Sequence, residues 1–239
     1  TTIEILKLLI EKHHGAVRHA DIGSLLPIHL ASMRRSPAFC RVLIEAYPGS
    51  ERMSNDRGMS PLHLACYYNN VATVEYLYKL FPDAVNHAGK GGFYPIHGTI
   101  KKFCYTKNYT HHEMAAEMIE FLLDCDPSVK FQITPNRQPL LAWTAEHNIF
   151  DSNIEAGMQV IKVLYDSNPE AIESKDFVSK IQDYHPQVQT FINEQLVHAR
   201  QAKDRRLMTT PDGNGQLPLH TALQSNIRLG SIKLLVKGN

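Results

Sequence analysis

Apolar residues recur three or four positions apart in several segments of the chain, a spacing that predicts amphipathic helices with one buried face. The clearest examples are Ile3, Leu6, Leu9 and Ile10; Val71, Val74, Leu77 and Leu80; and Met118, Ile119, Leu122 and Leu123. Four apolar patterns of this kind end at a phrase that contains proline: Ala46-Tyr47-Pro48, Leu80-Phe81-Pro82, Cys125-Asp126-Pro127 and Ser167-Asn168-Pro169. Since proline disfavours the α conformation of the residue before it, each phrase predicts the end of a helix.

A second phrase recurs out of phase with the first. Its five copies are Leu26-Pro27-Ile28-His29-Leu30-Ala31, Ser60-Pro61-Leu62-His63-Leu64-Ala65, Tyr94-Pro95-Ile96-His97-Gly98-Thr99, Gln138-Pro139-Leu140-Leu141-Ala142-Trp143 and Leu217-Pro218-Leu219-His220-Thr221-Ala222. Their prolines are 34, 34, 44 and 79 residues apart. Proline suits the first position of a helix, where its missing N–H costs nothing. Gly58, Gly92 and Gly215, three residues before a proline, allow a positive φ in the preceding loop.

The repeating unit is therefore a helix that begins at proline, a turn, a second amphipathic helix and a loop. Neither helix can bury its apolar face alone, so stacked units predict a solenoid. The stretch from Asn55 to Ala65, NDRGMSPLHLA, resembles the ankyrin repeat, whose pattern is D-x-x-G-x-T-P-L-H-x-A at a period near 33 residues. The resemblance covers most of residues 1–173 and 211–239, and 209–239 also resembles arrays expanded in some unicellular eukaryotes. It implies an all-α array that acts as a protein-binding scaffold.

We expect one ankyrin-repeat solenoid over residues 1–239, with a long helix inserted before the last repeat. Its expected units are 1–19 (partial), 20–53, 54–87, 88–132, 133–173, 174–210 and 211–239 (truncated). Both ends of the sequence are expected to be cut from a longer chain, the second within the apolar face of residues 234–239. Within 174–210, an apolar face predicts a helix over about 187–204. This segment is either a degenerate repeat with one overgrown helix or a dedicated partner-binding helix.

Three departures from the pattern carry further expectations. Residues 101–112 and 147–153 lengthen two units and should project from the rim opposite the interrepeat loops. Trp143 replaces the alanine of the other copies, which predicts either wider helix spacing or a shifted helix start in the fourth copy.

Composition narrows the class of protein. The net charge of +1 argues against a dedicated nucleic-acid or membrane surface, while a local patch remains open. With 43% hydrophobic and 21% charged residues, the chain has the values of a globular protein. No apolar stretch approaches a membrane span of about 18 residues. The four cysteines lie far apart, so we expect them to be reduced in an intracellular, cytoplasmic protein.

The candidate chemistry is structural rather than catalytic. His29, His63, His97 and His220 occupy one repeated position, and the resemblance implies that this histidine bonds near the helix start. His13-His14 and His111-His112 lack the spacing of metal ligands, so we expect no metal site. The chain carries no nucleotide-binding or hydrolase motif, and the run from Gly89 to Gly92 fits a hairpin turn. We therefore expect neither enzymatic activity nor a cofactor.

The family's exposed concave positions identify the expected binding surface. The residues predicted to contact a partner are Met33, Arg34, Asn55, Asp56, Arg57, Tyr67, Tyr68, Lys90, Lys101 and Lys102. Tyrosine and arginine are enriched at interface hot spots. The expected partner of this fragment, itself a monomer, is another protein and neither nucleic acid nor a membrane. Two other functions compete with this one. The first is a regulatory or targeting module of a larger enzyme, kinase or channel. The second is nucleic-acid association, which would weaken steeply with salt, through Lys101, Lys102, Lys107, Arg200, Lys203, Arg205 and Arg206.

Overall fold

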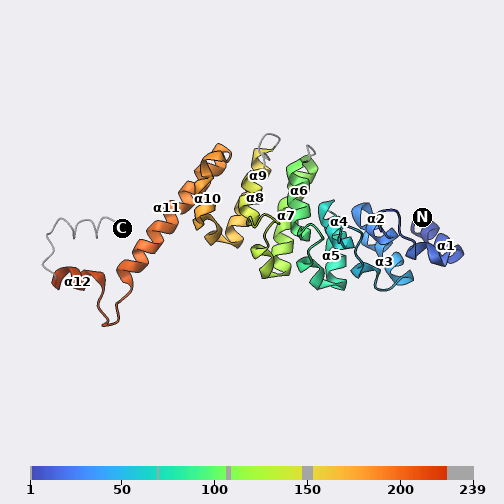
Figure 1. Cartoon of the computed structure of the whole chain (residues 1–239), viewed down its shortest axis with the longest axis horizontal. Helices are drawn as coiled ribbons and strands as arrows, with labels where there is room; N and C mark the ends of the chain where they lie inside the picture. Colours follow the sequence, from blue (N-terminus) through green and yellow to red (C-terminus); the bar gives the residue numbers. More distant parts are fainter. Residues whose placement is uncertain (1, 69, 106–108, 147–152, 225–239) are drawn as a thin grey trace.

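The helices of the chain stand side by side in a row, as a computed structural model shows (Figure 1). It describes residues 2–68, 70–105, 109–146 and 153–224. The first helices of the units are α2 (Pro27–Arg34), α4 (Pro61–Tyr67), α6 (Pro95–Tyr105) and α8 (Leu140–Glu146). The second helices are α1 (Thr2–Lys12), α3 (Pro37–Ala46), α5 (Val71–Leu80), α7 (Tyr109–Cys125) and α9 (Ile154–Ser167). Within these ranges no strand forms, which confirms the all-α solenoid.

A short 3-10 helix follows each of the second helices α1, α3, α5, α7 and α9. They are η1 (His14–Arg18), η2 (Ser50–Arg52), η3 (Pro82–Asn86), η4 (Pro127–Phe131) and η6 (Pro169–Glu173). In the last three, the proline of the recurrent phrase stands at the first position of the 3-10 helix. The phrase therefore ends one helix and begins the next, as the missing N–H of proline favours.

Proline also begins α2, α4, α6 and α12 (Pro218–Gln224), as the repeated phrase predicts. The fourth copy differs. Here α8 begins at Leu140, and Pro139 forms an isolated antiparallel bridge with Ile133. The Trp143 ring is buried beside α6, 5.4 Å from the ring of His97, and α8 packs less closely on α6 than α6 does on α4. The shifted helix start expected for the fourth copy is thus present.

The core runs along the row between neighbouring units. One buried cluster extends from Leu62 in α4 to Ile192 in α11 (Pro186–Thr209), and a smaller one lies between α2 and α3. Ile44 and Tyr76 pack against both clusters and connect them. Burying one such aliphatic side chain contributes about 1.5–3 kcal/mol, more than the loss of one helix cap costs.

The loop before each first helix has the same tight turn in all five copies. In the second copy the Asn55 N–H donates to the Met59 carbonyl and the Gly58 N–H to the Asn55 carbonyl. The residue at the position of Gly58 has a positive φ in every copy: Ser24 (57°), Gly58 (71°), Gly92 (72°), Arg137 (60°) and Gly215 (72°). The expected role of the three glycines is confirmed, and two copies reach the same conformation without glycine.

Consecutive loops are joined edge to edge by backbone hydrogen bonds. The Asp56 N–H donates to the Gly23 carbonyl, and the Lys90 N–H donates to the Arg57 carbonyl at 2.8 Å. A Cβ at Gly58 would lie 2.7 Å from the Lys90 nitrogen. Gly58 is thus required twice, for the left-handed turn and for the close approach of the next loop.

The repeated histidine holds the start of its helix. Its Nδ1 accepts the backbone N–H of the residue three positions earlier, at 3.0–3.2 Å in all four copies. Because Nδ1 accepts, Nε2 carries the proton. In His29, Nε2 donates to the Met53 carbonyl, 3.1 Å away, and so ties α2 to the segment that enters the next unit. The structural role implied by the resemblance is confirmed for these rings.

The first insertion lengthens two helices where the structure describes it. Residues 101–105 continue α6 and 109–112 begin α7; residues 106–108 and 147–152 lie outside the described part. In Figure 1 the long α6 rises above α4 and α2 on one side of the row.

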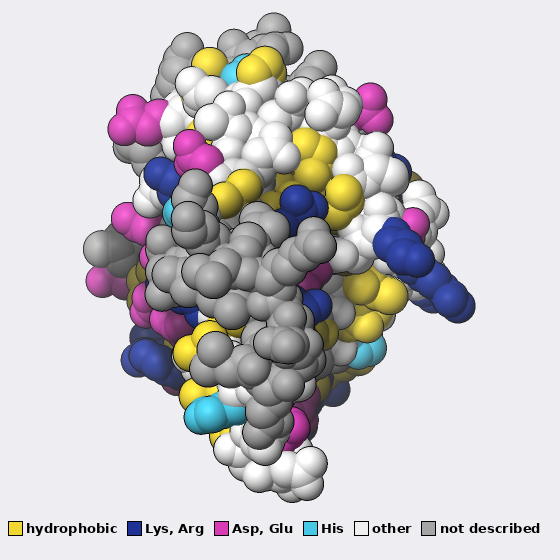
Figure 2. Space-filling view, turned by 90° about the vertical axis from the view of Figure 1, so that its left-hand side faces the viewer, with side chains coloured by type: hydrophobic (Ala, Val, Ile, Leu, Met, Phe, Trp, Pro, Cys, Tyr) yellow, Lys and Arg dark blue, Asp and Glu magenta, His cyan; other side chains and the backbone are white. Residues whose placement is uncertain are grey.

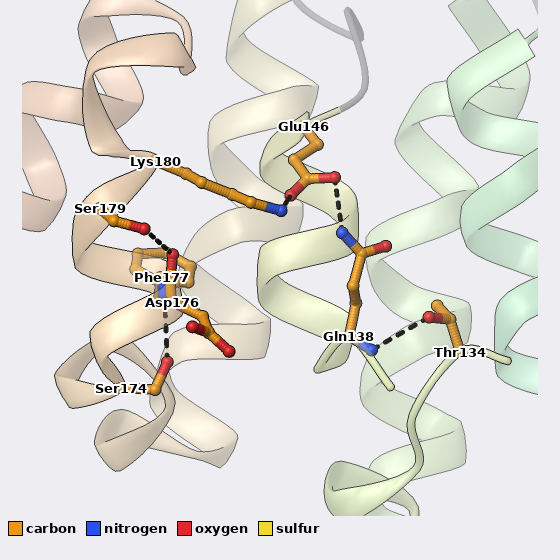
Figure 3. A network of polar contacts seen from close by, with 8 residues as sticks. All are labelled: Thr134, Gln138, Glu146, Ser174, Asp176, Phe177, Ser179 and Lys180. Atoms are coloured by element: carbon orange, nitrogen blue, oxygen red, sulfur yellow. Dashed lines mark hydrogen bonds and ion pairs between the residues drawn. The ribbon is translucent and has the colours of Figure 1, made fainter. Parts of the chain in front are cut away.

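Residues 174–210 form a short helix, α10 (Lys175–Ser179), a 3-10 turn, η7 (Ile181–Asp183), and the long α11. Phe177, Tyr184, Val188 and Ile192 are buried in the core. Lys180 joins this segment to α8 through an ion pair with Glu146 (Nζ–Oε1 2.7 Å), and Gln138 donates to the other carboxylate oxygen (Figure 3). Exposed pairs of this type contribute at most about 1 kcal/mol, so the buried side chains provide most of the attachment.

The distal part of α11 leaves the row. Residues 200–209 are all exposed, and α12 packs at that end, away from α10 (Figure 1). Seen from this end, hydrophobic side chains form separate patches between charged and polar ones (Figure 2). The long helix therefore separates the last repeated phrase from the stack. The apolar face at residues 234–239 lies outside the described residues. None of the described helices is long and apolar enough to cross a membrane.

We predict opposite effects of substitutions at two positive-φ positions. Gly58→Ala should lower the free energy of unfolding by about 1–3 kcal/mol, because its Cβ strains φ and meets the next loop. Arg137→Gly should raise it by up to about 1 kcal/mol, because the exposed arginine pays a steric cost that glycine does not. Urea unfolding of both variants tests this. Equal effects of the two substitutions would contradict the loop assignment.

We also predict that His63→Ala lowers the free energy of unfolding by about 1–3 kcal/mol, since it leaves the buried Ser60 N–H without its acceptor. His220→Ala is the matched control. It removes the same contact at an exposed site, where water can replace the ring, and should cost about 0.5 kcal/mol or less. Thermal melts of the two variants provide the comparison, and an unchanged melting temperature of His63→Ala would refute the assignment.

Candidate functional site

A groove of about 1020 Å³ runs along the concave side of the first three complete units. It is lined by the first helices α2, α4 and α6 and by the loops that precede them. The stacked loops form one wall because their backbones are hydrogen-bonded to each other, and the helices form the floor because they pack side by side.

Eight of the ten residues expected to bind a partner line this groove: Met33, Asn55, Asp56, Arg57, Tyr67, Tyr68, Lys90 and Lys101. The other two, Arg34 and Lys102, lie beside it over the rings of Tyr67 and Tyr68. Met33 and Lys101, 68 residues apart in the sequence, thus lie on one face, because the array places the same column of successive helices side by side.

Two tyrosines at the end of α4 form the centre of this face. The rings of Tyr67 and Tyr68 meet edge to face, 5.3 Å apart and at 70°. Arg34 from α2 lies 5.6 Å from the centre of the Tyr68 ring, and Lys102 from α6 lies 5.6 Å from the centres of both rings. Cation–π contacts of this kind contribute about 0.5–1 kcal/mol each at exposed sites. Three neighbouring units therefore order each other's side chains here.

Phe93 forms a second aromatic position, which the sequence analysis missed. Its ring is 38% exposed, with Lys101 Nζ 5.9 Å from its centre. Leu25 and Met59 hold the same place in the two preceding loops, two residues before the proline, and both line the groove. A column of apolar residues in otherwise polar loops was the signal that could have found them.

The loop wall carries charge. Arg57, Asp56 and Lys90 are exposed on it, and Asp56 accepts a hydrogen bond from the Ser24 hydroxyl. Asn55 differs from these three. It is 9% exposed, and its amide oxygen accepts the N–H groups of Arg57 and Met59. Asp21 and Asp212 make the same contacts in their loops, so the structure gives Asn55 a loop-forming role.

The floor of the groove lacks a side chain at one position where α6 meets α4. Gly98 stands at the position that Leu30 and Leu64 occupy in the two preceding helices, and it lines the groove. A Cβ there would lie 3.4 Å from the His63 carbonyl oxygen and the Tyr67 nitrogen, which is ordinary contact. The glycine lets the backbones of α6 and α4 approach closely, so backbone rather than a side chain forms the floor of the groove at this point.

The titratable groups of the groove floor are neutral histidines. Burial, and then the neighbouring charge of His87, lower the pKa of His63 to about 4. Burial lowers the pKa of His97 to about 4 as well. Each ring uses Nδ1 to hold its helix start, so neither is placed to exchange protons with a bound molecule. Across the described part of the chain, no cluster of three or more His, Cys, Asp or Glu side chains could hold a metal ion.

Comparisons with known proteins agree with this architecture. Residues 1–87 match the sequence family of ankyrin repeats, in three copies. Two similar solved structures are the ankyrin repeat protein EF0377, at 14% identity, and an ankyrin repeat domain from Acinetobacter baumannii, at 16%. Both have a TM-score of 0.51; the matches cover 70% and 69% of this chain and 75% of each of those chains. No match is found among curated proteins. Residues 1–87 thus match the ankyrin-repeat family, and the solved structures show the same fold over about 70% of the chain. Ankyrin repeats generally mediate protein–protein interaction.

The buried histidines predict loss of stability in acid. The folded pKa of His63 and of His97 is about 4, below the ordinary value of 6.5, so the unfolded chain binds more protons between these values. Their contribution is fully present above pH 6.5 and is lost as the pH falls toward 4, at up to about 1.4 kcal/mol per pH unit for each ring. Urea unfolding as a function of pH measures the slope. His63→Ala should make it shallower, and an identical slope in this variant would contradict the burial effect.

Proposed function

We propose that this chain is a non-catalytic scaffold that binds another protein through the concave groove and its loop wall. The observation that carries the proposal is the cluster of Tyr67, Tyr68, Arg34 and Lys102, in which three successive units present partly exposed aromatic and cationic side chains on one face. Tyrosine and arginine are the residue types that most often dominate the free energy of protein association.

The arrangement of the groove supports binding rather than catalysis. General acid–base catalysis needs titratable side chains within reach of a bound substrate and with a pKa near the working pH. Here His63 and His97 are buried beneath the floor, their pKa is about 4, and backbone N–H groups occupy their acceptor atoms. The exposed groups along the groove are mainly lysine, arginine and tyrosine side chains, which suit contact with a partner surface.

The shape of the groove also suits a macromolecule. A volume of about 1020 Å³ lies at the upper limit of small-molecule pockets, which measure roughly 300–1,000 Å³. The groove spans three units and lies open along them, so a partner could follow it from loop to loop. The same face would serve if the chain is a regulatory or targeting module of a larger enzyme, kinase or channel; the full-length sequence distinguishes the two cases.

Within this proposal the partner is an intracellular protein met in the cytoplasm, and the chain itself is a monomer. The four cysteines are free, and Cys40 and Cys66 are buried, where burial raises the pKa of the Cys40 thiol to about 11. Thiols in this state are packing groups suited to a reducing compartment. Size-exclusion chromatography with light scattering tests the monomer, and fractionation of cells tests the location.

We predict that replacing Tyr67 and Tyr68 together by alanine weakens partner binding without unfolding the array. Each half-buried ring contributes contact area at the centre of the face, so the loss should be about tenfold or more. Quantitative affinity purification followed by mass spectrometry would compare the variant with the unmodified chain.

Phe131→Ala provides the matched control. Phe131 also lies under a cation, with Lys130 Nζ 5.0 Å from its ring centre, but it is 65% exposed in η4 and does not line the groove. It should keep the partners that the double variant loses. If every partner is recovered equally by all three proteins, the groove is not the binding surface.

A further inference from the structure

We propose that the partner segment bound in this groove is an extended acidic peptide whose apolar side chain inserts above Gly98 while its carboxylates meet the surrounding lysines and arginines. This inference rests on the proposed function and specifies its ligand. It follows from three observations: the local charge of the groove, the apolar floor, and the way the cations are held.

The charge of the groove is strongly unbalanced. Five cationic side chains border it, namely Arg34, Arg57, Lys90, Lys101 and Lys102. Among the lining residues the only carboxylate is that of Asp56, which already accepts the Ser24 hydroxyl. The whole chain has a net charge of only +1. This face therefore carries an excess of positive charge, and a partner of complementary charge is acidic.

The floor between these cations is apolar and recessed. Met33, Leu64 and Phe93 line it from three successive units, and Gly98 removes the side chain that the repeat places there in α2 and α4. Because apolar side chains bind where they lose contact with water, this recess favours an apolar anchor. A purely acidic segment would leave the recess unused.

The cations are held in place before a partner binds. Lys102 lies over both tyrosine rings, Arg34 over one of them, and Lys101 over Phe93. Their charged groups remain accessible at the rim, while the rings restrict the motion of the side chains. Ordering them in advance lowers the entropy cost of binding a carboxylate.

The same features of the groove favour a peptide over single-stranded nucleic acid as its ligand. Nucleic-acid grooves stack successive bases on free aromatic faces along a cationic track. Here Tyr67 and Tyr68 contact each other edge to face and already carry Arg34 and Lys102. The floor offers an apolar recess instead of a free ring face, so the acidic peptide is the occupant that the groove fits.

Selection from a displayed library of random peptides on the unmodified chain tests the inference. We expect the recovered sequences to be rich in Asp and Glu around one or two apolar residues. The best peptide, labelled with fluorescein, should bind more weakly as salt is raised, and Lys101→Glu with Lys102→Glu should reduce its affinity by about tenfold or more.

A control variant tests whether the effect on affinity is specific to the charges at the groove, and a second variant tests the apolar floor. Lys79→Glu with Lys162→Glu reverses the same number of charges on exposed positions of α5 and α9 and should leave the affinity within about twofold. Gly98→Leu introduces the leucine that α2 and α4 carry at this position, covers the backbone floor and should abolish the preference for an apolar anchor. Thermal melts of each variant confirm that the array is folded.

The results of these experiments can overturn the acidic-peptide inference without overturning the proposed function of the groove. Recovery of neutral or basic peptides that still require Tyr67 and Tyr68 overturns the acidic ligand but keeps the groove as a binding surface. Failure to recover any peptide overturns the extended ligand, while the purification of partners with the tyrosine variant tests the groove itself. A labelled oligothymidine that displaces the best peptide and binds more tightly would identify nucleic acid as the ligand instead.

Discussion

The structure depends on one constraint: no helical pair in this chain can bury its apolar faces alone, so each unit is stable only against its neighbour. The buried side chains of α4, such as Leu62 and Ala65, belong to one continuous cluster with Ile96 and Ile100 of α6. Side-by-side packing of the helices sets the distance between units. That distance brings each loop within hydrogen-bonding range of the next, as the Arg57 carbonyl and Lys90 N–H show. The groove is a consequence of this stacking, because its floor consists of helices and its wall of loops that the core holds in register.

Residues that differ from one repeat to the next determine which side chains of the groove can contact a ligand. The residues that shape the loop turn, such as Asn55 and Gly58, serve the fold in nearly the same way in each unit. The residues that differ between units, Tyr67, Gly98 and Lys101 among them, face the groove. The repeated histidine belongs to the first group: its ring is buried in the first three copies, where it holds a helix start. Fold and recognition therefore use different positions of the same unit, so the binding surface can vary without loss of the core.

The regularity weakens toward the second half of the row. At α8 the buried Trp143 accompanies looser packing on α6 and a helix start one position later. After η6 the chain passes through the single residue Ser174 into α10, so the interrepeat loop that builds the groove wall in earlier units is missing there. Phe177 and Ile192 still enter the core, so this segment continues the packing of the row. The groove accordingly lies along the earlier units, where helices and loops repeat together.

The sequence by itself determined the fold class, the positions of the prolines and glycines, and the column of concave residues, because each follows from a local rule repeated at a fixed period. Proline restricts its own φ, glycine permits a left-handed turn, and apolar spacing selects the buried face of a helix. The tertiary structure alone decided what depends on distances between units. It showed that Lys102 of one unit and Arg34 of another contact the tyrosines of a third. It also showed that the amide oxygen of Asn55 accepts hydrogen bonds within its own loop and that Phe93 lines the groove. It also placed α12 at the end of a helix that extends beyond the stack. Contacts of this kind arise from packing between segments far apart in the chain, and no local pattern specifies them.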